Sequence, residues 1–310
     1  MSGRRCGGWA RGLALLLVAG CLSLVAGCAT RPRPVETGLL MLWEVRAPGG
    51  SGGSATLLGS LHLGRSPFAL DPAVTRAYRE ADVLVFEVAP EEMSPAAVLE
   101  LLQELGQLPP GKSLRELLPP ATWSALRARL DEAGVPVESV LPFEPWVALF
   151  QVMGLDLAAA GFQAEKGLER QLLAQTPGCP VLGLETVRSQ LGLFDELPLS
   201  TQVEMLAQTL RAGAQSENDL QLMLSAWEAG DDRLLERLLA PEGSDPAMRL
   251  FHERIFTERN RNMARRLGEL LQRPAHYFVT VGAGHTVGSD GIPALLRRQG
   301  FLVRRIPQSP

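Results

Sequence analysis

The sequence predicts an α/β fold: a mixed, largely parallel central sheet flanked by helices, with a large helical insertion between two strands. Two observations lead to this prediction. Short, nearly unbroken apolar runs recur along the chain, and such runs are typical of strands covered on both faces of a parallel sheet. Between them, apolar residues recur every three to four positions, which is the period of an amphipathic helix. A chain of 310 residues can bury a large core in such a fold.

The composition is that of an ordinary globular protein, with 46% hydrophobic and 21% charged residues. The formal net charge is -4, and nucleic-acid binding generally needs a clustered basic face. Arginines do gather between Arg254 and Arg273, but glutamates lie among them, which favours a solvated helix face. We therefore expect no nucleic-acid partner.

Residues 1–28 have the organisation of a lipoprotein signal peptide. Arginines precede an apolar stretch that ends in Leu24-Val25-Ala26-Gly27-Cys28, which resembles the bacterial lipobox. The stretch is shorter than the ~20 residues that a membrane-spanning helix needs, so a plain anchor is the weaker alternative. We predict lipidation at Cys28; a similar motif ending at Cys21 follows a rather short apolar core.

Residues 29–38 are predicted to be a tether, and residues 39–310 the folded domain. The lipid would hold the protein outside the cytoplasm on the cell membrane, and on the outer membrane facing the periplasm if the cell has two membranes. Cys179 is the one cysteine in the domain, so an intramolecular disulfide is not expected there.

The first part of the domain reads as strand, hairpin loop, strand, helix and strand. Residues 39–45 are the first predicted strand, and a loop rich in glycine and serine leads to a second strand ahead of His62. A helix then runs from Asp71, a favourable N-cap before a proline, to about Ala81. The apolar run at residues 83–87 follows as a strand, so this unit predicts a right-handed crossover.

Helical patterns punctuated by proline dominate from residue 94 to about residue 175 and form the predicted insertion. A strand at residues 181–185 follows. Further helices are expected at residues 200–212, 217–229, 231–239 and 246–271. The chain closes with a strand ahead of His285, a helix at residues 292–298 and a strand at residues 301–306.

Two Gly-x-x-His motifs, Gly59–His62 and Gly282–His285, each end a strand-like run, although the chain has only four histidines. Glycine permits a sharp turn as the backbone leaves the sheet, and we assign this role to Gly59, Gly282 and Gly284. A histidine placed after such a turn faces the crevice at the strand ends.

Four side chains end the strand-like runs: His62, Glu87, Glu185 and His285. Parallel strands share one carboxyl edge, so these residues are expected to face one pocket. Taken singly, each has an ordinary interpretation as a turn residue, helix cap or salt-bridge partner. Together they could bind a divalent transition metal ion (Mn, Co, Zn or Fe), or act without metal with histidine as the base. Either arrangement would activate water.

The order of these motifs resembles the TraB/PrgY/GumN family, which includes the Tiki-type proteins and is distantly similar to erythromycin esterases and ChaN-like proteins. The resemblance covers about residues 39–306. It is carried by Leu57-Leu58-Gly59-Ser60-Leu61-His62, Val85-Phe86-Glu87, Gly183-Leu184-Glu185-Thr186, Arg259-Asn260 and Val281-Gly282-Ala283-Gly284-His285, with Gly288 and Gly291. Ser60 stands where the family usually has threonine, and it keeps a hydroxyl.

The resemblance implies an α/β fold and, for the Tiki branch, metal-dependent proteolysis by histidines and glutamates. It places metal ligands at His62, Glu87 and His285, with Glu185 as a further ligand or the general base. Arg259 and Asn260 match a recurring pair and are expected to bind substrate. Arg259 would hold a substrate carboxylate or steady Glu185, and an ordinary surface arginine is the alternative.

His252 and His276 match no motif and are interpreted as structural or exposed. The prediction for the whole chain is a membrane-tethered extracytoplasmic hydrolase, metal-dependent and peptidase-like, with a peptide or small-molecule substrate such as an ester. The alternative is a non-catalytic lipoprotein that sequesters a peptide, metal or haem in the same cleft. A scaffold with a vestigial cleft is the third possibility.

Overall fold

The structure is a computed structural model, and it describes residues 39–50, 52–175, 178–212, 215–240 and 246–307. The predicted signal peptide, the tether and Cys28 lie outside these residues. Within them, no helix combines the length and the apolar character that a membrane span requires.

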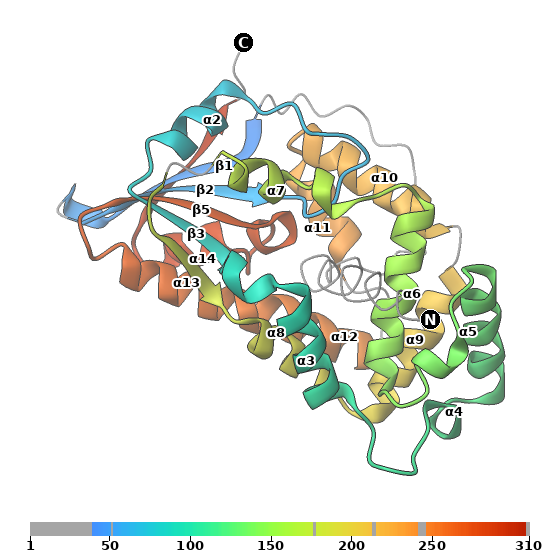
Figure 1. Cartoon of the computed structure of the whole chain (residues 1–310). Helices are drawn as coiled ribbons and strands as arrows, with labels where there is room; N and C mark the ends of the chain where they lie inside the picture. The colour runs from blue at the N-terminus through green and yellow to red at the C-terminus, as the bar shows by residue number, and fades with distance from the viewer. Residues whose placement is uncertain (1–38, 51, 176–177, 213–214, 241–245, 308–310) are drawn as a thin grey trace.

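Six strands form one mixed sheet in the order β4-β3-β5-β2-β1-β6 (Figure 1). The strands are β1 (Leu39–Arg46), β2 (Ser54–Ser60), β3 (Val83–Val88), β4 (Val181–Glu185), β5 (His276–Gly282) and β6 (Leu302–Pro307). Strands β2, β5, β3 and β4 are mutually parallel, whereas β1 is antiparallel to both β2 and β6. The predicted largely parallel sheet and the hairpin between its first two strands are confirmed.

Helices cover both faces of the sheet (Figure 1). On one face lie α2 (Pro72–Arg79) and α7 (Leu168–Leu173), and on the other α13 (Arg259–Leu270) and α14 (Ile292–Arg298). The alternation of side chains along β3 follows this division, because Leu84 and Phe86 pack with α2 and α7 whereas Val85 joins the opposite core. Glu87 is two residues beyond Val85 and therefore points to the face on which α13 lies.

The predicted helical insertion is present between β3 and β4, and a second helical segment connects β4 to β5. The first contains α3 (Pro95–Gly106), α4 (Leu114–Leu117), α5 (Pro120–Glu132), α6 (Pro145–Ala159) and α7. The second contains α8 (Val187–Asp195), α9 (Leu199–Ala212), α10 (Gln215–Glu228), α11 (Asp232–Leu239), α12 (Pro246–His252) and α13. Several of these helices, α3, α6, α8 and α9 among them, extend beyond the carboxyl ends of the parallel strands (Figure 1).

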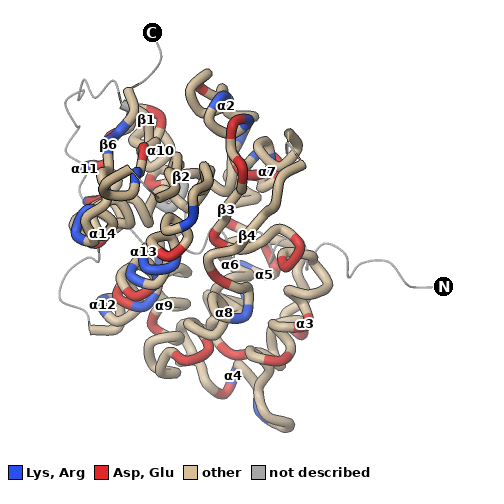
Figure 2. The backbone as a smooth tube through the Cα atoms, turned by 90° about the vertical axis from the view of Figure 1, so that its left-hand side faces the viewer, with Lys and Arg blue, Asp and Glu red and all other residues tan. Residues whose placement is uncertain are grey.

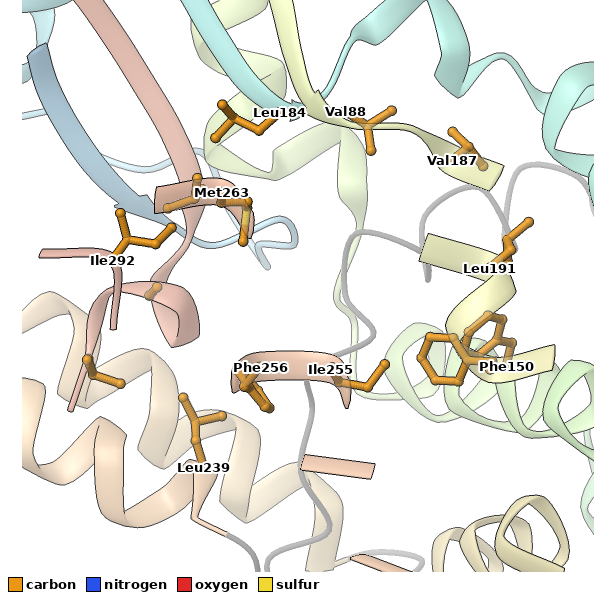
Figure 3. Close-up of a cluster of buried hydrophobic side chains, with 14 of the residues drawn as sticks. Val88, Phe150, Leu184, Val187, Leu191, Leu239, Ile255, Phe256, Met263 and Ile292 are labelled. Atoms are coloured by element: carbon orange, nitrogen blue, oxygen red, sulfur yellow. The ribbon is translucent and has the colours of Figure 1, made fainter. Parts of the chain in front are cut away.

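A continuous apolar core fastens this helical part to the sheet. Phe150 of α6 packs edge-on against Phe194 of α8, with ring centroids 4.6 Å apart. Figure 3 shows Phe150 and Leu191 in the same buried cluster as Ile255 and Phe256, which lie just before α13. The strand ends are therefore covered by a packed helical layer rather than by loose loops.

The predicted long helix at residues 246–271 is interrupted. One wider turn of π-helix, Glu253–Glu258, separates α12 from α13. Such a turn changes the phase of the following residues, and here Ile255, Phe256 and Arg259 all become buried. This phase places the Phe256 ring 5.5 Å from the His285 ring.

Most arginines of this helical run are exposed. Acidic residues lie among them, as Figure 2 shows for α13. Arg265 pairs with Glu269 at 2.9 Å and Arg261 with Glu253 at 3.0 Å. Arg254 is partly buried, whereas Arg259 is buried and donates hydrogen bonds to carboxylates at the strand ends.

Candidate active site

The strand register brings four candidate residues to one edge of the sheet. Ser60 at the end of β2 pairs with Gly282 at the end of β5, and Val88 at the end of β3 pairs with Glu185 at the end of β4. His62 and His285 follow β2 and β5 closely, while Glu87 and Glu185 belong to the last residues of their strands. Side chains separated by up to 223 positions along the chain therefore meet.

Glu87 is the centre of this group. Its Oε1 accepts a hydrogen bond of 2.6 Å from the Gly282 N–H. The same oxygen lies 4.0 Å from Nε2 of His62 and 3.7 Å from Nε2 of His285. The carboxylate is 8% exposed, so both imidazoles face a negative charge that is largely shielded from water.

Arg259 joins the two glutamates. Its Nη2 donates to Oε2 of Glu87 at 2.8 Å and to Oε2 of Glu185 at 2.7 Å, and its Nε donates to Glu185 at 3.0 Å. Gln190 also donates to Glu185, at 3.0 Å. The interpretation of Arg259 as a surface arginine is wrong, because the residue is 6% exposed. Two roles remained for Arg259, holding a substrate carboxylate or steadying Glu185, and the geometry shows the second.

Each histidine is held from behind by a different partner. Nδ1 of His62 lies 2.7 Å from the carboxylate of Glu169, which also accepts a hydrogen bond of 2.9 Å from the Ser60 hydroxyl. Nδ1 of His285 lies 2.6 Å from Oδ1 of Asn260. Carboxylates and amide oxygens behind an imidazole fix its orientation and tautomer.

Asn260 determines which nitrogen of His285 carries the proton. Its Nδ2 donates to the carbonyl oxygen of Asp290 at 2.9 Å, so its Oδ1 is the atom that faces His285 and accepts. Nδ1 of His285 is therefore the protonated nitrogen, and Nε2 presents a lone pair toward Glu87. Asn260 was predicted to bind substrate, but it is 3% exposed and holds His285 instead.

The electrostatic environment differs among Glu87, His285 and His62. Burial alone would raise the pKa of Glu87, but His285, Arg259, His62 and the Gly282 N–H together lower it to about 2. Burial lowers the pKa of His285 to about 3, against the opposing effect of Glu87. Glu87 is thus ionised and His285 neutral at neutral pH.

The pKa of His62 is shifted in the opposite direction from the pKa of His285. Burial favours the neutral ring, but the charge and hydrogen bond of Glu169 outweigh burial and raise the pKa of His62. The contrast follows from the partners behind the rings, a carboxylate for His62 and a neutral amide for His285.

Among the residues that the structure describes, no group of three or more histidine, cysteine, aspartate or glutamate side chains stands in ready metal-binding geometry. The donor types at the centre nevertheless fit a divalent transition metal ion. The lone pair on Nε2 of His285 and the Glu87 carboxylate are both acceptors, and they face each other at 3.7 Å. A cation placed between two facing acceptors would turn their repulsion into attraction.

A cavity of about 360 Å³ opens beside this centre. His62, Glu87, Glu169 and Gln190 belong to its lining, so a molecule in the cavity can reach His62 and the Glu87 carboxylate. Glu185 does not line it and is engaged by Arg259 and Gln190. The geometry therefore gives Glu185 a supporting position behind Glu87.

The three glycines assigned to turns are also places of close packing. None of the three has a positive φ, so none adopts a backbone conformation that glycine alone favours. Space is the reason at Gly282, where an added Cβ would lie 2.9 Å from Nε2 of His62 and 3.2 Å from Oε1 of Glu87. At Gly284 it would lie 2.7 Å from the Phe256 ring, and at Gly59 3.0 Å from the Thr286 hydroxyl.

The two remaining histidines lie apart from this centre, as expected. Nδ1 of His276 is 2.9 Å from the Ser54 hydroxyl at the far end of β2. His252 is half-buried and packs on Phe256 with ring centroids 5.0 Å apart. Neither residue lines the cavity beside Glu87.

Sequence reasoning missed two residues, Glu169 and Gln190. Glu169 lies on α7, and no strand end or motif marks it. Gln190 carries a weak signal, because α8 begins directly after β4 and its first turns pass back over the strand end. Only the packing of α7 and α8 on the sheet reveals either role.

Fold and site together define an α/β protein in which histidines and glutamates from four parallel strand ends meet around one buried carboxylate. The family model described as TraB/PrgY/gumN family matches residues 41–305. The chain belongs to this family.

Curated relatives are distant. Metalloprotease TIKI1 of Danio rerio is 23% identical, with 75% of this chain and 56% of the relative covered. Metalloprotease TIKI2 of Xenopus tropicalis is 23% identical, with 96% and 68% covered. An uncharacterized protein of Treponema pallidum (strain Nichols) is 23% identical, with 94% and 89% covered. The chain thus spans about half the length of the TIKI1 protein, and no solved structure matches it significantly.

Proposed function

We propose that this protein is a metal-dependent hydrolase of peptidase type. The observation that carries the proposal is that Nε2 of His62 and Nε2 of His285 both face the Glu87 carboxylate at the wall of a cavity. The name metalloprotease, which the TIKI relatives bear, supports the same class of reaction.

In this proposal His62, Glu87 and His285 hold the metal ion, which is Mn, Co, Zn or Fe. A divalent ion bound there would lower the pKa of its water toward ~7 and so supply hydroxide at neutral pH. Asn260 keeps the lone pair of His285 directed inward, and Arg259 with Gly282 keeps Glu87 ionised and in place. Glu169 orients His62 and can take up a proton at the cavity wall.

The second part of the proposal concerns location. A lipid on Cys28 would anchor the chain to the outer face of a membrane, with residues 29–38 as a tether. The motif at Leu24–Cys28 supports this assignment. A peptide substrate would then be met outside the cytoplasm.

The test uses the full chain purified in detergent. Elemental analysis is expected to find a divalent transition metal near one equivalent, and the protein is expected to cleave peptides from a mixed library. His62→Ala and His285→Ala should each lose the metal and at least about 100-fold of the cleavage rate, because each removes a ligand.

His252→Ala is the matched control, since this histidine lies outside the centre, and it should keep both properties. Peptide binding without turnover in the metal-loaded protein would contradict the hydrolase and favour a sequestering lipoprotein. Cleavage that survives both site substitutions would show that the reaction occurs elsewhere.

A further inference from the structure

The two histidines also border a second cavity, of about 100 Å³. His62 lines both cavities, whereas Glu87 lines only the larger one and His285 only the smaller. The reactive centre therefore stands between two separate spaces. A chain-like substrate that crosses the centre would enter both.

The two spaces differ in chemistry. The smaller cavity is walled by apolar side chains of α10, α11 and the loops, among them Leu220, Met223, Leu224, Leu235, Leu239 and Phe162. The larger one combines apolar residues, Phe86 and Met93 among them, with polar and charged groups, including Glu165, Glu169, Arg170 and Gln190. The smaller cavity is thus suited to an apolar group, whereas the larger one can receive a group of mixed character.

The apolar wall is a firm part of the fold. Met223 is 7% exposed and Leu235 is 2% exposed, and both belong to the main core cluster. Asp231 caps the start of α11 by accepting from the Leu234 N–H at 2.9 Å. Figure 3 shows Leu239, at the end of α11, near Phe256, and both side chains lie close to Gly284 beside His285.

We infer that the smaller cavity receives an apolar side chain of the peptide substrate next to the bond that is hydrolysed, and that Met223 and Leu235 limit its size. This inference rests on the proposed function. Hydrolysis adds one water across the amide, the oxygen to the carbonyl carbon and a proton to the leaving amine. A leucine-sized group gains from leaving water, whereas a hydroxyl would lose its hydrogen bonds there.

The first test measures kcat/KM for peptides that differ at one residue beside the cleaved bond. Leucine is expected to exceed serine by at least about 10-fold, as for other hydrophobic specificity pockets. Met223→Ala enlarges the cavity and should move the preference toward phenylalanine, whereas Met223→Phe fills it and should move the preference toward alanine. Opposite shifts from one position cannot come from a general loss of folding.

Leu222→Ala is the matched control, because Leu222 is the neighbouring residue on α10 and lines neither cavity. Its preference between leucine and serine should equal that of the unaltered chain. An equal rate for both peptides, or the same shift in both Met223 variants, would overturn the specificity pocket and leave the hydrolase intact.

The second test does not depend on turnover. With ¹³C-methyl methionine in the full chain, the Met223 resonance is identified among the eight methionines by its loss in Met223→Leu. N-acetyl-leucine amide should shift this resonance, and N-acetyl-serine amide should not. A leucine-specific shift without any peptide cleavage would support the pocket while the hydrolase fails. Absence of both the shift and the preference would refute the pocket.

Discussion

At the scale of single residues, the site depends on how one buried carboxylate is surrounded. Glu87 has three kinds of neighbours: a backbone N–H from Gly282, a permanent cation from Arg259, and two imidazoles. The guanidinium donates two charge-assisted hydrogen bonds to Glu185 and one to Glu87, which a neutral group of similar size could not do. Arg259 is therefore expected to matter for both stability and chemistry.

Replacing Arg259 by methionine keeps much of the side-chain volume but leaves the buried Glu87 and the partly buried Glu185 without their shared cation. We expect a loss of about 3–5 kcal/mol in the free energy of unfolding, since one partner of a buried ion network is removed. Urea unfolding followed by circular dichroism measures it. Arg265→Met on the same helix removes an exposed pair and should cost below about 1 kcal/mol. Equal losses would show that Arg259 is not a structural cation.

The pKa of His252 is lowered by burial, with Glu253 and Asp290 acting in the opposite direction. Below the unfolded-state pKa near 6.5, His252 binds a proton in the unfolded chain more readily than in the folded chain. The neutral buried ring therefore contributes fully to folding stability above pH 6.5, and this contribution is lost as the pH falls. His252→Asn should therefore lose less stability than the unaltered chain between pH 7 and pH 5. Melting curves at both pH values measure the difference, and an identical pH slope would contradict it.

At the scale of elements, the ends of four strands position the chemistry, and close packing at these ends leaves no room for a side chain at Gly282. This glycine has φ -55° and ψ 140°, which any residue can adopt, so its identity is set by space and not by conformation. The π-helical turn before α13 also positions the chemistry, because it turns Arg259 inward while the following arginines stay exposed.

Gly282→Ala is expected to fold but to disturb the centre, because its Cβ would lie 2.9 Å from Nε2 of His62 and 3.2 Å from Oε1 of Glu87. We expect at least about a 100-fold drop in peptide cleavage, as for displacement of a catalytic group by about 1 Å. Gly192→Ala is the control: nothing lies within 4 Å of its added Cβ on α8, and alanine there should stabilise the chain by about 0.5–1 kcal/mol. Full activity of Gly282→Ala would refute the packing argument.

At the scale of the whole molecule, the domain is one sheet with a helical layer over the carboxyl ends of its parallel strands (Figure 1). His62 borders two cavities, a smaller one with a mainly apolar lining and a larger one that combines apolar and charged residues. The proposed lipid anchor would present this whole unit to peptides outside the cytoplasm.

The anchor itself is tested by labelling cells with radioactive palmitate. Cys28→Ala should abolish incorporation and release the domain from the membrane fraction, because the lipidated thiol is removed. Cys21→Ala should leave both unchanged, since its motif follows the shorter apolar core. Labelling that is lost in Cys21→Ala would show that Cys21 is the lipidated residue. Absence of labelling in the unaltered chain would refute the lipoprotein assignment.

Local sequence alone was sufficient to predict the strands and the edge on which the candidate residues gather. An apolar run that is followed by glutamate or by Gly-x-x-His indicates where a strand ends. Parallel pairing places such strand ends side by side. His62, Glu87, Glu185 and His285 could be named for this reason.

The individual roles of the residues at the site were decided by the tertiary structure. Whether Arg259 and Asn260 face a substrate or hold Glu185 and His285 depends on the phase of the helix, which one π-helical turn alters. Glu169 reaches His62 only because α7 packs over the strand ends. Periodicity along a chain determines where an element ends, whereas the distances between side chains of different elements arise only when those elements pack.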